Sequence, residues 1–172
     1  MHPMKLLGKA LSIATLIVLM SVSMVSKSAA QYENAITINP LPLIFPLHEL
    51  SAQYEFSTSR SNSLAIRGNF VSSIADFNAV GFGGTYRFFL TDEKAIGGFA
   101  VGPALDLFFF SNSTTNRSVT VYAFGADASY QFFFSHFALQ PQLDLRFGGG
   151  GDGVTAYIGT NIYLSLYLGY AW

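Results

Sequence analysis

The strongest constraint in this sequence is a two-residue alternation of side-chain character that runs from Glu49 to the C-terminus. The final segment shows it most clearly. Every second residue from Ile162 to Trp172 is large and apolar, whereas the residues between them are small, polar or tyrosine. A period of two is that of a β-strand, whose successive side chains point to opposite faces of a sheet. The pattern therefore predicts an all-β protein.

Seven segments repeat this alternation, and an eighth, Ile36–Phe45, is irregular because Pro40, Pro42 and Pro46 interrupt it. The seven are Glu49–Phe56, Leu64–Ser72, Val80–Leu90, Phe99–Phe109, Tyr122–Phe134, Phe137–Phe147 and Asn161–Trp172. Short turn-like stretches separate them, so neighbouring segments are expected to form antiparallel hairpins. Pro103 and Pro141 fall inside segments, where each removes a ladder hydrogen bond, and we expect a local bulge at each.

The two faces of the segments differ in charge. The large apolar face carries no charged residue, and all eight strand charges lie on the other parity: Glu49, Glu55, Arg67, Arg87, Asp106, Asp127, Asp144 and Arg146. A soluble barrel needs the reverse arrangement. In lipid, a charge facing outward is costly and unpaired backbone groups force the sheet to close. The sequence therefore predicts an eight-stranded antiparallel up-and-down transmembrane β-barrel with a polar, side-chain-filled interior.

Aromatic residues gather near the expected strand ends. With the chain starting on the periplasmic side, one group falls near that rim: Phe56, Phe88, Phe99, Phe132, Phe134, Phe137, Tyr170 and Trp172. A second group falls near the outer rim: Phe45, Phe70, Phe109, Tyr122 and Phe147. Two aromatic girdles are typical of membrane barrels.

The first thirty residues look like an export signal rather than part of the fold. Lys5 and Lys9 precede an apolar stretch, Leu11–Val25, and Ser28-Ala29-Ala30 supplies the small residues of a cleavage site. The alternative is an uncleaved membrane anchor, which normally needs about 20 apolar residues. We expect cleavage before Gln31, leaving residues 31–172 as one barrel domain in the cell outer membrane.

Composition excludes several other classes. The formal net charge is −1, with nine Lys and Arg residues and no basic run, so a nucleic-acid partner is not expected. The chain has no cysteine, which removes disulfide scaffolds, thiolate zinc sites and cysteine nucleophiles. No cofactor or metal site is expected.

The export signal, the eight alternating strands and the ending Leu166-Tyr167-Leu168-Gly169-Tyr170-Ala171-Trp172 resemble small bacterial outer-membrane barrels of the OmpA/OmpX-like class. Two further segments, 86–90 and 98–103, are similar to those of an uncharacterised family of such barrels. The resemblance implies that Tyr170 and Trp172 form the C-terminal signal read by the barrel-assembly machinery. It implies lipid and lipopolysaccharide as surroundings, a monomer, and no catalytic residue.

The candidate site is the set of inward charges: Glu55, Arg67, Arg87, Asp106, Asp127, Asp144 and Arg146. A two-residue turn at Ser135-His136 would place Asp127 opposite Asp144, with Arg146 diagonal to Asp127. Such a carboxyl pair would either favour protonation of one group or be bridged by Arg146. Glu55 is expected near both Arg67 and Arg87. The set is interpreted as a buried ion-pair network, with a proton or cation site as the alternative.

The expected function is a non-enzymatic outer-membrane barrel with a structural or surface-exposed role. The alternatives are a small channel, a surface binding module using the loops Ser111–Ser118 and Gly148–Gly153, and a lipid-modifying enzyme. His48 and His136 fall at opposite ends of the expected barrel, so they cannot share a site. Ser135-His136 has the neighbouring Ser and His of an outer-membrane lipid A deacylase, but on the periplasmic side.

Overall fold

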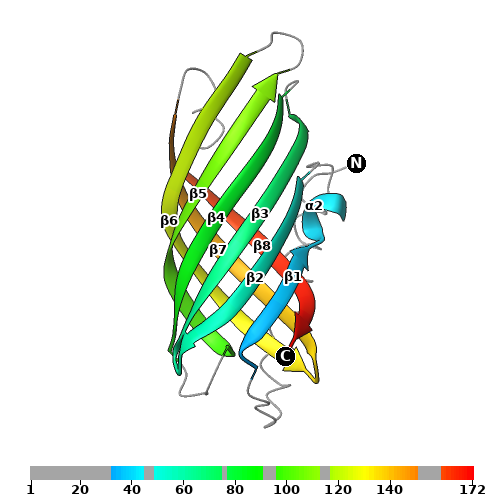
Figure 1. Cartoon of the computed structure of the whole chain (residues 1–172), viewed down its shortest axis with the longest axis vertical. Helices are drawn as coiled ribbons and strands as arrows, with labels where there is room; N and C mark the ends of the chain where they lie inside the picture. The colour runs from blue at the N-terminus through cyan, green and yellow to red at the C-terminus, as the bar shows by residue number, and fades with distance from the viewer. Residues whose placement is uncertain (1–31, 45–48, 75–76, 91–95, 113–116, 151–159) are drawn as a thin grey trace, which may run out of the picture.

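The chain forms a closed barrel of eight antiparallel strands (Figure 1). The computed structural model describes residues 32–44, 49–74, 77–90, 96–112, 117–150 and 160–172. Each strand pairs with the next along the chain, and β8 closes the barrel against β1. The strands are β1 (Asn34–Asn39), β2 (Glu49–Ser59), β3 (Asn62–Ile74), β4 (Phe77–Phe89), β5 (Gly98–Asn112), β6 (Arg117–Phe134), β7 (Phe137–Gly150) and β8 (Thr160–Ala171).

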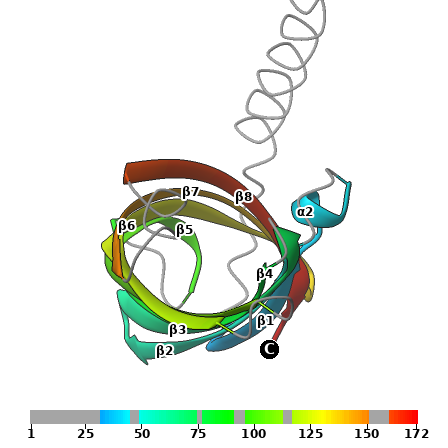
Figure 2. The same cartoon turned by 90° about the horizontal axis from the view of Figure 1, so that it is seen from above.

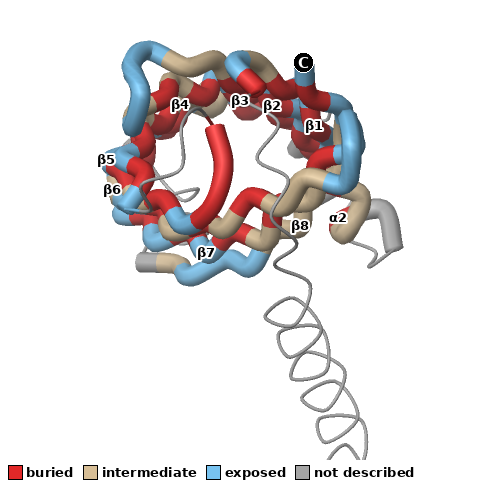
Figure 3. The backbone as a smooth tube through the Cα atoms, turned by 90° about the horizontal axis from the view of Figure 1, so that it is seen from below, coloured by how far each residue is buried: buried red, intermediate tan, exposed pale blue. Residues whose placement is uncertain are grey.

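The expected alternation of faces is confirmed along the strands. Inward residues are buried and mostly small or polar, whereas outward residues are large, apolar and exposed (Figure 3). Arg87 is 0% exposed inside the barrel, whereas Ile162 and Leu164 on the outer face are each 70% exposed. The buried interior is therefore polar, and the apolar side chains are on the outside.

The hairpin between β6 and β7 has the expected two-residue loop, Ser135-His136. Phe134 pairs with Phe137, and the same register places Asp127 directly opposite Asp144. Ser135 has a φ of 55°, and a positive φ at the first loop residue is what a tight type II′ hairpin turn requires.

The bulges expected at Pro103 and Pro141 are not present. Pro103 pairs with Ala126 and Pro141 with Leu166, and the register on both sides of each strand is unchanged across the proline. That prediction was wrong because a strand residue sends its N–H toward only one neighbour. A proline therefore removes one ladder bond without forcing an extra residue into the strand.

The expected strand Ile36–Phe45 is also shorter than predicted. β1 ends at Asn39 and is followed by one turn of helix, α2 (Leu41–Ile44), which lies outside the barrel wall (Figure 2). The Leu41 N–H donates to Asn39 Oδ1 at 3.1 Å, an N-cap contact that favours the turn. No helix in the described ranges has the length and apolar character needed to cross a bilayer.

Two apolar clusters lie inside the barrel, one toward each end. The cluster at the lower end in Figure 1 contains Tyr32, Ala35, Phe89, Ile96, Ala100, Ala138 and Ala171, with Phe133 packed against it. The cluster toward the upper end contains Val71, Ala79, Phe110, Val121 and Ala123, with Phe108 and Val119 against it. The polar lumen lies between these clusters.

Several expectations fall outside the described residues. These are the export segment 1–30, the loop residues 113–116 and 151–153, and two single residues, Phe45 and His48. The strands extend into both expected loops, Ser111–Ser118 and Gly148–Gly153. β5 continues to Asn112, β6 begins at Arg117, and β7 continues to Gly150.

Candidate functional site: the polar lumen

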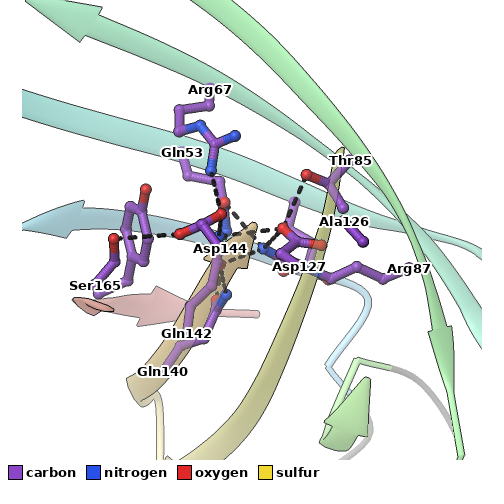
Figure 4. A network of polar contacts seen from close by, with 12 residues as sticks. Gln53, Arg67, Thr85, Arg87, Ala126, Asp127, Gln140, Gln142, Asp144 and Ser165 are labelled. Carbon is purple, nitrogen blue, oxygen red and sulfur yellow. Dashed lines mark hydrogen bonds and ion pairs between the residues drawn. The ribbon is translucent and has the colours of Figure 1, made fainter. Parts of the chain in front are cut away.

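Seven buried charged side chains lie in the lumen, and Figure 4 shows four of them, Arg67, Arg87, Asp127 and Asp144. Four of the seven are carboxylates and three are guanidinium groups, and none is more than 6% exposed: Glu55, Arg67, Arg87, Asp106, Asp127, Asp144 and Arg146. They come from β2, β3, β4, β5, β6 and β7. The structure thus brings together every residue of the candidate site.

Arg87 is the centre of the lower part of this group. Its guanidinium forms an ion pair with Glu55, lies 3.5 Å from Asp127 Oδ2 and donates to Gln142 Oε1 at 2.6 Å. It also donates to Gln53 Oε1 at 3.1 Å. A guanidinium without exposure is stable only with partners of this kind, since an unpaired buried charge is very costly.

Arg67 and Arg146 hold the upper part. Arg67 Nη2 lies 2.8 Å from Asp106 Oδ1, and Arg146 Nε lies 2.7 Å from Asp106 Oδ2, so two cations share one carboxylate. Both also reach Asp144 Oδ1, at 3.7 Å from Arg67 Nη1 and 2.7 Å from Arg146 Nη2. These four side chains form a closed ring of alternating charge.

The structure shows which partners these charged groups have. Arg67 has its ion pairs with Asp106 and Asp144, and only Arg87 pairs with Glu55. The opposed carboxylates Asp127 and Asp144 are bridged by the Gln142 side chain. Its Nε2 donates to Asp127 Oδ2 at 3.1 Å and to Asp144 Oδ1 at 2.7 Å. Long side chains in the lumen reach across the barrel. The residue opposite a charged group on the adjacent strand is therefore often not its ion-pair partner.

The amide side chains are the part of the site that sequence reasoning missed. Gln53, Gln131, Gln140 and Gln142 are buried on the inward parity and connect the charged groups. Gln131 donates to Glu55, as does Ser63, while Thr85 donates to Asp127 Oδ2 at 2.9 Å. These glutamines could have been identified from their positions in the alternating pattern. A polar residue on the inward parity of a closed barrel must contact other lumen residues.

The strands make room for these groups with small residues. Gly83 pairs with Asp106, and a Cβ at position 83 would lie 1.8 Å from Asp106 Oδ1. A side chain there would displace the carboxylate that Arg67 and Arg146 share. Gly83 is therefore part of the site although it carries no functional group.

Tyr32 closes the lower end of the lumen. Its ring packs 4.8 Å from that of Phe133, centroid to centroid, and its hydroxyl donates to the Ser135 carbonyl. Its own carbonyl accepts from the Ile96 N–H at 3.2 Å. An apolar layer therefore separates the charged groups from the lower mouth.

Of the residues considered for catalysis, Ser135 and His136 form the turn between β6 and β7, and His48 lies outside the described residues. His136 stacks on Tyr170 at 5.1 Å, and its Nδ1 lies 2.9 Å from the Ala171 carbonyl oxygen, both at the lower end. Among the described residues, no group of three or more His, Cys, Asp or Glu side chains is arranged to hold a metal ion.

The two residues of the expected assembly signal lie on the outer face at the lower end. Tyr170 and Trp172 stack with centroids 6.1 Å apart, and Trp172 also stacks on Tyr54 at 6.2 Å. The Trp172 carbonyl accepts from the Asn34 N–H at 3.0 Å, so the last residue continues the closure of the barrel.

Comparison with models of known protein families, with curated proteins and with solved structures finds no match for this chain.

Proposed function

We propose that this chain is a small bacterial outer-membrane β-barrel protein of the OmpA/OmpX-like class. The observation that supports this most is the reversed sidedness of the wall. Buried ion pairs fill the inside, and large apolar side chains cover the outside. Water favours the opposite arrangement, whereas a lipid bilayer favours this one.

The role that fits the lumen best is structural or surface-exposed rather than enzymatic. An eight-stranded barrel has an interior that its own side chains can fill. Here the six ion pairs and the glutamine side chains occupy it, and Tyr32 caps its lower end. Such a lumen supports a rigid scaffold that holds loops at the surface.

The remaining features of the proposal concern export and assembly. Residues 1–30 act as a cleaved signal peptide, and the barrel inserts as a monomer among outer-membrane lipids and lipopolysaccharide. The barrel-assembly machinery recognises the C-terminal strand, with Tyr170 and Trp172 as the assembly signal. Their position on the outer face, stacked on each other, leaves both aromatic rings accessible to lipid or to a receptor.

Membrane fractionation with a folding assay tests the proposal. The expressed protein should float with outer-membrane vesicles, resist carbonate extraction, and migrate differently on gels before and after boiling. Its N-terminal residue should be Gln31. Recovery of a folded protein in the soluble fraction without detergent would contradict the proposal.

A channel is the alternative that conductance resolves. The packed lumen predicts no unit conductance in planar bilayers for the folded barrel. Regular single-channel steps from protein that is folded by the gel assay would replace the scaffold with a channel.

A further inference from the structure

Among the described residues, no strand lies between β8 and β2 in the upper half of the barrel. β8 pairs with β7 along its whole length, from Thr160 opposite Phe147 to Tyr170 opposite Phe137. Its pairing with β1 covers only Leu168–Ala171, since β1 ends at Asn39. Among the described residues, the outer half of β8 has no strand on its other side. We call this opening, between residues 160–167 of β8 and Glu49 of β2, the seam gap.

The hydrogen-bonding pattern shows which backbone groups face the seam gap. Asn34 and Trp172 exchange both backbone hydrogen bonds, so the even-numbered residues of β8 direct their N–H and C=O toward β1. The same alternation directs the backbone of Ile162, Leu164 and Leu166 into the gap. On the other side, Ser57 donates to the Glu33 carbonyl, so the odd-numbered residues of β2, including Glu49, face it too.

The sequence itself prevents β1 from filling this space. Ile38 pairs with Leu168, so continuing β1 would set Pro40 opposite Leu166 and Pro42 opposite Leu164. Those two positions must donate an N–H to β8, which proline lacks. The continuation would also turn Leu41 and Leu43 inward, toward polar groups. The chain leaves the wall instead and forms α2 on the outside (Figure 2).

Exposure marks the same opening. Ile162 and Leu164, at 70% each, are the two most exposed large apolar side chains of the described part of the chain. Tyr163 lies on the inward parity of β8 yet is 44% exposed, whereas Tyr167, also inward but next to β1, is buried. The most exposed part of β8 is therefore the part that β1 does not cover.

We propose that the seam gap is a docking site for an extended peptide strand of another protein, with apolar and basic residues in alternation. β1 occupies one strand position between β2 and β8 lower down, so the gap above it is one strand wide. A strand running in the direction of β1 is antiparallel to both neighbours and pairs with the open backbone groups of each. Its outward residues continue the apolar outer face.

The charge of Glu49 favours basic residues at the inward positions of the docked peptide strand. In the register of β1, the second position after Asn39 would face Glu49 on one side and Ser165 on the other. The Glu49 carboxylate makes no ion pair with a described residue, and the cation that attracts it, Arg67, is already paired with Asp106 and Asp144. A lysine or arginine side chain from the peptide would give Glu49 a partner.

A second copy of this chain does not fit the seam gap. Two barrels inserted in the same sense have both β8 strands running downward, so two open β8 edges cannot meet as an antiparallel pair. The inference rests on the proposed membrane location in one respect, because open backbone groups are costly in lipid and this cost favours a strand as the occupant.

Cross-linking in detergent micelles tests the proposal with the whole mature chain. The probe is a nine-residue peptide of alternating leucine and lysine with a maleimide at its central apolar position. The chain has no cysteine, so Leu164→Cys introduces a single thiol at the seam gap. Leu105→Cys on β5 is the matched control, since Leu105 is 62% exposed on the outer face but has strands on both sides. Cross-linking of Leu164→Cys only is the expected result.

Two further comparisons separate strand pairing from simple partitioning of an amphiphile. A peptide methylated on alternate backbone nitrogens should bind about tenfold more weakly or worse, because it cannot donate to β8. Glu49→Gln should weaken binding of the unmodified peptide about two- to fivefold. Equal cross-linking of both cysteine variants, or equal affinity of both peptides, would overturn the proposal in favour of nonspecific or lipid-like occupation.

Failure of the docking site and failure of the proposed membrane location give different results. Protein that floats with membranes but fails to discriminate between the peptides refutes the docking site and leaves the proposed function intact. Protein that stays soluble without detergent refutes the proposed function, whatever the peptide result.

Discussion

The inner and outer faces of the barrel wall come from the same strands, one residue apart, yet they differ completely in chemistry. Gln142 is buried and holds both Asp127 and Asp144, whereas Leu143 beside it is 49% exposed on the outside. The inner face gains stability from paired charges that exclude water. The exposed apolar side chains of the outer face add no such stability in water. The two faces therefore suit different surroundings, a polar interior and an apolar exterior.

The largest expected effect breaks the inner face at Arg87. Arg87→Met keeps an unbranched apolar stem at this position but removes the guanidinium, which leaves Glu55 and Asp127 without their cation. Removing one member of a buried pair costs about 3–5 kcal/mol. The folded form on gels should convert to the unfolded form at clearly lower temperature. Arg60→Met, in an exposed turn, is the control and should leave that temperature unchanged.

The next effect breaks the outer face. Leu143→Arg places a charge on the outward side of β7, where the proposed lipid contact would make it cost about 2–4 kcal/mol. Thr120→Arg, also outward but near the upper end of β6, should cost about 1 kcal/mol or less. Urea unfolding in vesicles measures both. Equal tolerance of the two substitutions would argue against a lipid-facing wall.

A smaller effect is expected from Arg146→Ala. Asp106 and Asp144 lose one guanidinium, but Arg67 still contacts both. We therefore expect a loss of about 1.5–3 kcal/mol, which is typical of hydrogen bonds to charged groups, and a modest decrease in heat resistance. An unfolding temperature identical to that of the unchanged protein would remove this ring from the account of stability.

The smallest effect is at a residue on neither face. Ser135 has a positive φ, which costs a residue other than glycine about 1 kcal/mol. Ser135→Gly should therefore stabilise the barrel only slightly, by up to about 0.5 kcal/mol after the entropy of glycine is counted. Urea unfolding followed by tryptophan fluorescence measures it, and a clear destabilisation would contradict the turn geometry.

The sequence was sufficient for seven of the eight strands, for the side of the wall to which their residues point, and for one register. Side-chain period depends only on neighbours in the chain, so the parity of Glu55, Asp106 and Asp144 followed directly. The register of Asp127 against Asp144 followed from the two-residue turn at Ser135-His136, because loop length fixes pairing in a hairpin.

Partner choice inside the lumen was not predictable in the same way. Arg67 meets Asp106 two strands away, and Arg146 meets the same carboxylate from the opposite direction. Such contacts depend on the stagger of the closed barrel, which no single hairpin determines. The role of Tyr32 was missed for the same reason, since its neighbours come from distant parts of the chain.

The prolines show how a local rule gives different results in different places. Pro103 and Pro141 leave the register unchanged, whereas Pro40 and Pro42 end β1 and open the seam gap. Two consecutive donor positions are lost at β1, and only one at each of the other strands. A strand in this barrel continues past one missing N–H donor, but β1 ends where two successive donors toward the same neighbouring strand are missing.

Site-directed labelling on adjacent residues of β7 tests the central claim most directly. Single cysteines at positions 142 and 143, in the cysteine-free chain folded into lipid vesicles, carry a spin label or an environment-sensitive dye. The account predicts that the label at 143 reports contact with acyl chains and that the label at 142 does not. Contact with bulk water at 143 would contradict it.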